Sequence, residues 1–244
     1  MEKIVLEGAT LTWNPIANPR GLVLICPGGG YEHLSPRESE PVERAFEEHG
    51  LQGIIVYYSC YEGTRLGWRP LHELGAALLF ARDKFPGIPV FVCGFSAGGH
   101  LAASLGVFWE REGYPRPDGL LLCYPVITAG EYAHAGSIAN LAEPGTEGEY
   151  SLERYAGPQV PPTFLWHTST DADVPVENSL LFAHALARAH VPVELHVYPR
   201  GVHGLSLVTK EVDQPEKGRT ADPYVAGWFD RCIAFVNDRI SRKS

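Results

Sequence analysis

The stretch that decides the fold is Pro89–His100, which reads PVFVCGFSAGGH. Its first half is a continuous apolar run, typical of a strand that is buried on both faces of a parallel sheet. Its second half contains the pattern Gly-x-Ser-x-Gly over 94–98, and a helical pattern of apolar residues extends over 97–111. A strand, a sharp turn and a helix in this order place a serine hydroxyl at the tip of a strained turn. We therefore predict that Ser96 is a nucleophile, with a purely structural glycine-rich turn as the alternative.

The rest of the chain alternates between short apolar runs and longer helical patterns. Apolar runs predict strands at 21–26, 54–58, 89–93, 119–124, 162–167 and 193–198. The last of these alternates in polarity, so it is expected near an edge of the sheet. Helical periodicity predicts helices at 38–49, 70–84, 97–111, 176–190 and 222–241. This alternation predicts an α/β fold with a mostly parallel central sheet and helices on both faces.

Length and composition fit one large domain. The chain has 244 residues, of which 45% are hydrophobic and 20% charged, which excludes a disordered tail, a coiled coil and a fibrous repeat. We predict a single domain over 1–244. The segment 128–159 breaks the alternation and is rich in Gly, Ala, Glu and Tyr. We predict a small cap over the site there, and a surface excursion with a short helix is the alternative.

Charge and cysteine content limit the partners and the compartment. The 20 basic and 29 acidic residues give a net charge of −9 without a basic cluster, so nucleic-acid binding is not expected. Residues 1–7 lack the apolar stretch of a signal peptide, and no apolar run is long enough to cross a membrane. The five cysteines are odd in number and widely spaced, which favours neither a disulfide framework nor a zinc site. We expect a cytoplasmic protein without a metal site or membrane partner, and a homo-oligomer is compatible with the sequence.

A serine nucleophile needs a base, and the base needs an acid that orients it. The loop after the fifth predicted strand carries Asp171 and Asp173, and the loop after the sixth carries His203 between glycines. Both loops follow the carboxyl ends of strands, where α/β sheets place their sites. We predict His203 as the base and Asp171 as the acid. Asp173 is the alternative acid, although it could instead cap the next helix.

A glycine-rich turn, PGGGY over 27–31, follows the first long strand. Ester hydrolysis passes through an oxyanion, and backbone N–H groups must already point at it. We predict the N–H groups of Ala97, Gly29 and Gly30 as the oxyanion hole. A phosphate-binding loop is disfavoured, because neither a Gly-Lys-Ser/Thr nor a Gly-x-Gly-x-x-Gly pattern follows.

At these motifs the chain resembles α/β-hydrolase serine esterases over nearly its whole length. It is most similar to the small carbohydrate acetyl-esterase branch, described as acetylxylan-esterase-like. The similar motifs are PGGGY at 27–31, LSPRE at 34–38, GFSAGGH at 94–100, WHT at 166–168 and VPVENS at 174–179. Proline stands at position 27, where the related esterase pattern begins with histidine.

The resemblance has implications for the site. It implies an α/β-hydrolase fold with a small cap insertion, favours Asp171 over Asp173, and implies no metal or organic cofactor. It also implies short acyl esters as substrates, especially acetyl groups on sugars. Four side chains would then border the acyl and alcohol pockets: Tyr31, His33, Tyr58 and Tyr124.

We therefore predict a serine carboxylic-ester hydrolase that uses a Ser-His-Asp acyl-enzyme mechanism on a small-molecule ester. Two alternatives remain open. The loop around Asp171 also resembles that of prolyl-peptidase-type hydrolases, which allows a small serine peptidase. A fold can also host binding without catalysis, which allows a non-catalytic ligand-binding protein.

Overall fold

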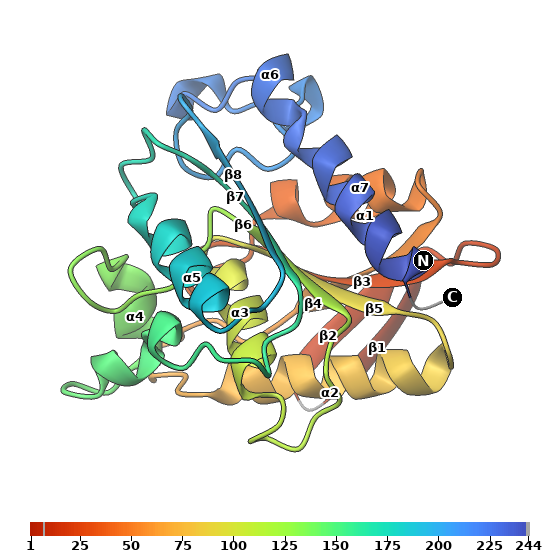
Figure 1. The fold of residues 1–244 in the computed structure, drawn as a ribbon, viewed down its shortest axis with the longest axis horizontal. Helices are drawn as coiled ribbons and strands as arrows, with labels where there is room; N and C mark the ends of the chain where they lie inside the picture. Colours follow the sequence, from red (N-terminus) through yellow and green to blue (C-terminus); the bar gives the residue numbers. More distant parts are fainter. Residues whose placement is uncertain (7, 243–244) are drawn as a thin grey trace.

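The computed structural model describes residues 1–6 and 8–242, and over these residues eight strands form one sheet with helices on both faces (Figure 1). The strands are β1 (Glu2–Leu6), β2 (Ala9–Trp13), β3 (Gly21–Cys26), β4 (Leu51–Tyr57), β5 (Val90–Phe95), β6 (Gly119–Cys123), β7 (Thr163–Thr168) and β8 (Val193–Tyr198). Their order is β1-β2-β4-β3-β5-β6-β7-β8. In this order, all neighbouring strands from β4 to β8 are parallel. The pairs β1–β2 and β2–β4 are antiparallel. The predicted α/β class with a mostly parallel sheet is confirmed.

Burial along the strands follows the apolar runs. Every residue of β3, β5, β6 and β7 is buried, which explains why the sequences of β3, β5 and β6 are apolar throughout and why β7 contains a run of three apolar residues, Phe164–Trp166. β8 is half-buried and ends the sheet, as its alternating sequence predicted. Because β5, β7 and β8 run parallel, their carboxyl ends lie at the same edge of the sheet.

Helices cover the two faces of the sheet as two groups (Figure 1). The helices are α1 (Glu40–Glu47), α2 (Arg69–Lys84), α3 (Ala97–Phe108), α4 (Ala135–Leu141), α5 (Glu177–Arg188), α6 (Pro223–Ala226) and α7 (Trp228–Ser241). One buried cluster joins the sheet to α1 and α7, and the other joins it to α2, α3 and α5. The helix predicted over 222–241 is divided at Gly227 into α6 and α7. Among the described helices, none is both long and apolar enough to span a bilayer.

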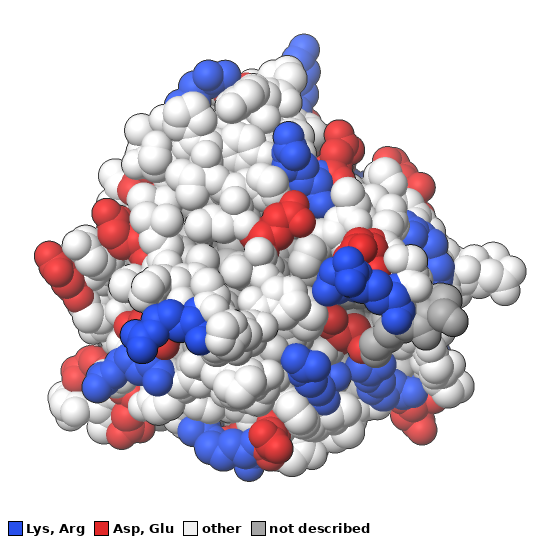
Figure 2. Space-filling model, in the orientation of Figure 1, with Lys and Arg blue, Asp and Glu red and all other residues white. Residues whose placement is uncertain are grey.

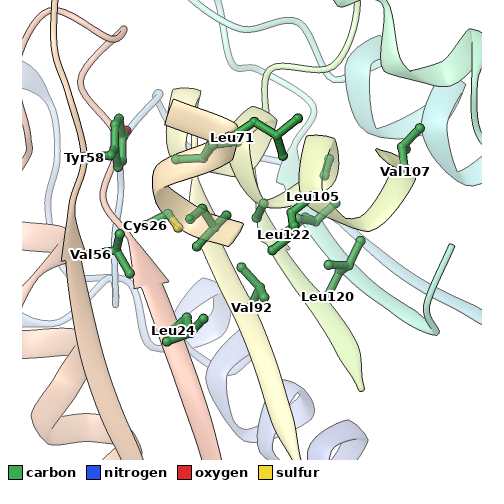
Figure 3. Close-up of a cluster of buried hydrophobic side chains, with 14 of the residues drawn as sticks. Leu24, Cys26, Val56, Tyr58, Leu71, Val92, Leu105, Val107, Leu120 and Leu122 are labelled. Atoms are coloured by element: carbon green, nitrogen blue, oxygen red, sulfur yellow. The ribbon is translucent and has the colours of Figure 1, made fainter. Parts of the chain in front are cut away.

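The larger core cluster fixes the strand that leads to the predicted nucleophile. Figure 3 shows Val92 of β5 between Leu24 of β3 and Leu122 of β6, with Leu71 of α2 and Leu105 of α3 packed above them. All five side chains are at most 1% exposed. Burial of such side chains contributes about 1.5–3 kcal/mol each, which stabilises the packing around β5.

The sequence analysis missed the first two strands. β1 and β2 form a hairpin in which Ile4 lies opposite Leu11, and β2 continues onto β4. The signal was the alternation of polarity over Thr10–Trp13, which is typical of a half-buried strand. The hairpin lies at the far edge of the sheet from β8.

The segment 128–159 contains α4 and two short 3₁₀ helices, Glu147–Tyr150 and Leu152–Arg154, and no strand. Asn178 of α5 anchors its beginning. The Asn178 side-chain carbonyl accepts from the backbone N–H groups of Ile127 (2.8 Å) and Thr128 (3.0 Å), and its amide donates to the Tyr132 carbonyl (2.9 Å). This buried amide ties the segment to the body of the domain.

The face of the molecule in Figure 2 carries acidic and basic side chains interspersed with one another. No large single-sign patch covers this face, which is typical of a solvated protein surface.

Candidate active site

Ser96 lies on the turn between β5 and α3, and its backbone is strained. Its φ is 53° and its ψ is −117°. This conformation is rare for a residue with a side chain and persists only where the surroundings enforce it. The Ser96 N–H donates to the Cys123 carbonyl (3.0 Å), and a Cβ on Gly94 would lie 2.1 Å from the Gly98 carbonyl oxygen. Glycine at 94 is therefore needed for the turn to close against the start of the helix.

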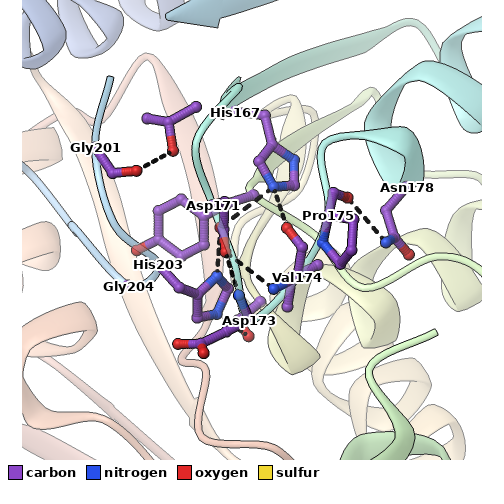
Figure 4. Close-up of polar contacts among 12 residues, drawn as sticks. His167, Asp171, Asp173, Val174, Pro175, Asn178, Gly201, His203 and Gly204 are labelled. Atoms are coloured by element: carbon purple, nitrogen blue, oxygen red, sulfur yellow. Dashed lines mark hydrogen bonds and ion pairs between the residues drawn. The ribbon is translucent and has the colours of Figure 1, made fainter. Parts of the chain in front are cut away.

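The structure brings the three predicted side chains of the Ser-His-Asp arrangement together. His203 Nε2 lies 2.8 Å from Ser96 Oγ, and His203 Nδ1 lies 2.7 Å from Asp171 Oδ2. Figure 4 shows the contact between His203 and Asp171. Because the carboxylate can only accept, Nδ1 carries the proton and Nε2 is free to accept from the Ser96 hydroxyl. This is the geometry that proton transfer from serine to histidine requires, and the catalytic roles themselves stay predictions.

Asp171 is fixed on both of its oxygens. Oδ1 accepts from the backbone N–H groups of Asp173 (3.0 Å) and Val174 (2.9 Å), and Oδ2 also lies 3.3 Å from His167 Nε2. Burial would raise the pKa of this carboxyl, but the hydrogen bonds from His167 and His203 outweigh burial and hold its pKa well below the usual range. Asp171 is therefore ionised at neutral pH and unable to rotate freely.

His167 is a site residue whose role the sequence analysis did not assign. Its side chain is fully buried, and Nε2 lies 2.9 Å from the Val174 carbonyl as well as near Asp171 (Figure 4). The carbonyl can only accept, so Nε2 donates and Nδ1 accepts from the Ser179 hydroxyl at 2.8 Å. A histidine four residues before the predicted acid, at the end of a buried strand, was the available signal.

Asp173, the alternative acid, occupies a different position. Its carboxylate is exposed and lines the cavity beside Ser96, while its backbone N–H donates to Asp171. The N-cap of α5 is Val176, so Asp173 does not cap that helix.

The glycine-rich turn presents free backbone donors next to Ser96. Gly29 has a φ of 131°, and a Cβ there would lie 2.1 Å from the His33 carbonyl oxygen, so only glycine fits. Within the described chain, the N–H groups of Gly29, Gly30 and Ala97 donate to no protein acceptor. Ala97 begins α3, whose N-terminal dipole also favours negative charge there. These are the three donors predicted for the oxyanion hole, and their function stays a prediction.

The first half of this turn is held by two buried side chains. The Tyr58 hydroxyl donates to the Pro27 carbonyl. The Gly28 N–H donates to Glu38 Oε2 at 2.9 Å. The Pro27 carbonyl and the Gly28 N–H, which directly precede Gly29, are thereby fixed.

The second half is held from α3 and α4. Asn140 of α4 donates to the Gly30 carbonyl at 2.9 Å. The Tyr31 hydroxyl lies 3.0 Å from His100 Nδ1, and His100 Nε2 lies 3.0 Å from the Tyr150 carbonyl. Burial lowers the pKa of His100 to about 4, so the ring is neutral and accepts from Tyr31.

Of the four side chains expected to border the substrate, His33 alone is exposed and lines the cavity. Tyr31, Tyr58 and Tyr124 are at most 3% exposed, and their hydroxyls bond within the protein. The Tyr124 ring packs edge-on against the His203 ring at 5.1 Å. The three tyrosines therefore support the turns that carry the predicted catalytic groups.

A cavity of about 240 Å³ opens beside Ser96 and His203. It is lined by Gly29, Gly30, Glu32, His33, Ser35, Arg37, Glu38, Ser96, His134, Asp173, His203, Gly204, Lys217 and Arg219. None of these residues has an apolar side chain. Sequence reasoning missed most of them, because they come from loops that only the folded chain brings together. Across the described residues, no group of three or more His, Cys, Asp and Glu side chains is arranged to hold a metal ion.

His134, at the start of α4, brings the 128–159 segment into this cavity. Its Nδ1 lies 2.8 Å from Ser137 Oγ and accepts from the Ser137 N–H at 3.2 Å. Burial, reinforced by the nearby His203, lowers the pKa of His134, so the ring is neutral at pH 7. Because Nδ1 accepts, the proton lies on Nε2, which is a hydrogen-bond donor.

Two family matches agree with this geometry. Residues 76–149 match the alpha/beta hydrolase fold family, and residues 128–234 match the prolyl oligopeptidase family. The second match contains Asp171 and His203, and the first contains Ser96.

The curated relatives of this chain are larger proteins. It is 35% identical over 212 residues to an endo-1,4-beta-xylanase B of Butyrivibrio fibrisolvens, which covers 79% of this chain and 33% of the relative. It is 30% identical over 208 residues to an acetylxylan esterase of Xylanibacter ruminicola, which covers 79% of this chain and 42% of the relative. The chain thus spans about a third to two fifths of the length of these curated relatives.

Solved structures match over almost the whole chain. An acetyl ester-xyloside bifunctional hydrolase from Caldicellulosiruptor lactoaceticus has a TM-score of 0.81 and 34% identity, covering 94% of this chain and 88% of that chain. A sugar hydrolase from Lactococcus lactis has a TM-score of 0.85 and 30% identity, covering 100% of this chain and 99% of that chain. The resemblance to α/β-hydrolases seen in the motifs is therefore confirmed, and this chain belongs to the α/β-hydrolase family.

Proposed function

We propose that this protein is a serine carboxylic-ester hydrolase that removes short acyl groups, chiefly acetyl, from polar alcohols such as sugars. The observation that carries the proposal is the cavity beside Ser96, which is lined only by glycine and by polar or charged side chains. The names of the xylan-related and sugar-related relatives point in the same direction.

The lining of the cavity limits both halves of the ester. Most ligand pockets are largely apolar, and each buried CH₂ group of a ligand contributes about 0.8 kcal/mol there. This cavity offers a long acyl chain no apolar side chain to pack against, and the chain would also desolvate the charged groups around it. A hydroxylated ring, in contrast, provides hydrogen-bond partners for those groups. The cavity therefore favours a small acyl group joined to a hydroxyl-rich alcohol.

In the first step, Ser96 Oγ forms a bond to the ester carbonyl carbon while its proton passes to His203 Nε2. Asp171 stabilises the resulting imidazolium. The carbonyl oxygen becomes an oxyanion that accepts from the N–H groups of Gly29, Gly30 and Ala97. The carbon–oxygen bond to the alcohol then breaks, and His203 returns its proton to the leaving alcohol.

In the second step, water repeats the sequence. Its oxygen attacks the acyl-Ser96 carbonyl while His203 takes one of its protons. The bond between the acyl group and Ser96 Oγ breaks, His203 returns the proton to that oxygen, and the carboxylic acid leaves.

Replacing the nucleophile tests this mechanism directly. Ser96→Ala is expected to lower kcat on p-nitrophenyl acetate by at least about a thousandfold, because attack by Oγ is lost. Ser104→Ala is the matched control: Ser104 is also buried on α3, but its hydroxyl bonds the His100 carbonyl. Turnover in Ser96→Ala equal to that of Ser104→Ala would refute the proposal, and so would failure of a fluorophosphonate to label Ser96 in the folded wild type.

The acyl preference has its own test. We expect kcat/KM to fall sharply from acetyl to butyryl to octanoyl esters of one alcohol, and to be higher for acetylated sugars than for simple alkyl acetates. Octanoyl esters hydrolysed as fast as acetyl esters would contradict the short-acyl assignment.

A small serine peptidase is the second candidate, favoured by the prolyl oligopeptidase match over residues 128–234. The same Ser96 and His203 would then act on an amide. Side-by-side kinetics on acetyl esters and proline-containing peptide amides separate the two, and a higher kcat/KM on the amides would favour the peptidase.

A further inference from the structure

Glu38 is a buried carboxylate at the cavity that the proposed acyl-transfer steps leave unused. It ends the short 3₁₀ helix Pro36–Glu38, is 3% exposed, and lines the cavity together with Ser96. A buried charge without compensation is costly, so its partners reveal what it does.

Both oxygens of Glu38 face hydrogen-bond donors. Oε2 accepts from the Gly28 N–H at 2.9 Å, and Oε1 lies 2.6 Å from the Tyr124 hydroxyl. That hydroxyl accepts from the Ser206 N–H at 2.8 Å, so its own proton is directed to Glu38. Both oxygens of Glu38 therefore act as hydrogen-bond acceptors.

These contacts join the two loops that must be placed relative to Ser96. Gly28 immediately precedes the proposed oxyanion donors, and a Cβ at Gly28 would lie 2.8 Å from Glu38 Oε2 and 3.0 Å from Ser96 Cβ. Ser206 follows the proposed base, His203. One carboxylate thus holds the glycine-rich turn directly and the base loop through Tyr124.

Arg37 strengthens the same connection. Its guanidinium donates to the carbonyls of Gly204 (2.7 Å) and Val212 (2.6 Å), and the Ser206 hydroxyl donates to the Arg37 carbonyl (2.6 Å). Two adjacent residues, Arg37 and Glu38, therefore connect the glycine-rich turn to the loop after β8 through hydrogen bonds.

We propose that Glu38 is a positioning residue that holds the oxyanion donors and the base in register with Ser96. The inference rests on the proposed esterase function and deepens it. Oxyanion donors act because they are already in place when negative charge develops. Loosening the turn should therefore weaken binding of the transition state and leave binding of the ground-state ester nearly unchanged.

Glu38→Gln is the decisive variant because it keeps the size of the side chain. An amide has only one acceptor oxygen, so either Gly28 or Tyr124 loses its acceptor and meets an NH₂ group instead. Glu43→Gln is the matched control: Glu43 is also buried, at 2% exposure, and accepts from the Asn14 backbone N–H at 2.9 Å, but it does not line the cavity.

The expected result is a split between kcat and KM. On p-nitrophenyl acetate, we expect Glu38→Gln to lower kcat about 10- to 100-fold, less than or equal to the loss of a direct oxyanion donor, with KM within about twofold of wild type. The Ki of a methyl trifluoromethyl ketone, which forms a tetrahedral adduct with Ser96, should rise by the same factor as kcat falls. Glu43→Gln should change neither kcat nor Ki by more than about twofold.

Two results overturn the proposal. One is a folded Glu38→Gln protein whose kcat stays within twofold of wild type. The other is a fall in kcat without a matching rise in the ketone Ki, which indicates general disruption instead of a displaced oxyanion hole.

Tyr124→Phe keeps the test decisive if Glu38→Gln does not fold. It removes only the hydroxyl that links Glu38 to Ser206, so a smaller loss of kcat, about 3- to 10-fold, is expected with the same matching rise in Ki. A change below twofold in this variant then overturns the proposal.

The rate of fluorophosphonate labelling separates this proposal from the esterase assignment. If the wild type does not hydrolyse p-nitrophenyl acetate, the proposed function fails. The ratio of labelling rates between wild type and the Glu38 or Tyr124 variant still tests the positioning role, since the phosphoryl oxygen occupies the same oxyanion hole. Equal labelling rates overturn that role.

Discussion

The cavity beside Ser96 has two walls of opposite character. In the inner wall, the glycine-rich turn and the Ser96 turn are fixed by buried side chains such as Glu38 and Tyr58. The outer wall consists of Glu32, His33, Asp173 and Lys217, which are exposed and whose side chains form no hydrogen bond or ion pair with the described residues. Groups that stabilise a transition state gain by being fixed in advance, whereas groups that contact varied alcohols can remain free.

The largest effect should come from Asp171, which hydrogen bonds hold in place as they hold the inner wall. Asp171→Asn keeps the shape of the side chain but no longer fixes His203 with Nδ1 protonated. We expect kcat on p-nitrophenyl acetate to fall by about 10⁴-fold, the typical loss when the wrong tautomer is favoured.

The outer wall supplies the control for this experiment. Asp173→Asn changes an exposed carboxylate and keeps the backbone N–H that donates to Asp171. We expect its kcat to stay within about threefold of wild type, because water and salt screen the charge of a solvated carboxylate. A larger loss in Asp173→Asn than in Asp171→Asn would reverse the assignment of the acid.

The free energy of unfolding should show a similar contrast between the constrained turn at Ser96 and the 128–159 segment. In Gly94→Ala, the new methyl group would lie 2.1 Å from the Gly98 carbonyl oxygen, which is backbone and cannot move aside cheaply. We expect the free energy of unfolding, measured in urea, to fall by roughly 3 kcal/mol or more.

Gly148→Ala in the 128–159 segment is the matched substitution. Its new methyl group would meet only the flexible end of Arg154, at 3.4 Å. We expect a change within about 1 kcal/mol. Equal losses in the two variants would show that the Ser96 turn is no more constrained than the segment around Gly148.

The sequence alone predicted the inner wall better than the outer one. Six strands, five of them buried, and the turn around Ser96 follow from local patterns, since an apolar run ending in Gly-x-Ser-x-Gly needs no information from distant residues. Asp171 and His203 were predictable because the ends of parallel strands meet at one edge of the sheet.

Other features depend on contacts that no local pattern records. Tyr58 and Tyr124 follow strand ends, as substrate-binding residues often do, yet their rings point into the core and their hydroxyls bond Pro27 and Glu38. Lys217 reaches the cavity from the short 3₁₀ helix Pro215–Lys217, which follows β8. Such placements are set by tertiary packing, so the cavity lining could not be read from the sequence.

Two buried carboxyl groups, Asp171 and Glu43, show how hydrogen bonding and burial shift a pKa in opposite directions. Asp171 accepts hydrogen bonds from two imidazoles, and its pKa is lowered, whereas burial raises the pKa of Glu43 to about 7, against the hydrogen bond from Asn14. The pKa of such a carboxyl is higher in the folded protein than in the unfolded chain, so the folded state binds the proton more tightly. Its contribution to stability is complete at pH values below the unfolded pKa and is lost as the pH rises through the folded pKa.

We therefore expect the free energy of unfolding of the wild type to fall by about 1–3 kcal/mol between pH 5 and pH 8. Glu43→Gln should remove most of this fall, because the amide does not titrate. Urea denaturation at the two pH values measures both slopes. An undiminished fall in the variant would assign the pH dependence to other groups.

The smallest effect should come from His134, which lies between the two walls. Its neutral ring has Nε2 as a donor, and it comes from α4, which also fixes the Gly30 carbonyl through Asn140. If His134 donates to a hydroxyl of the alcohol, His134→Ala should raise KM for an acetylated sugar about 5- to 10-fold, the value of one hydrogen bond, with kcat little changed. On p-nitrophenyl acetate, whose leaving group has no such hydroxyl, both constants should stay within about twofold of wild type. A matching loss of kcat on both substrates would instead place His134 in the inner wall, because only a group that orders the reacting atoms lowers turnover regardless of the alcohol.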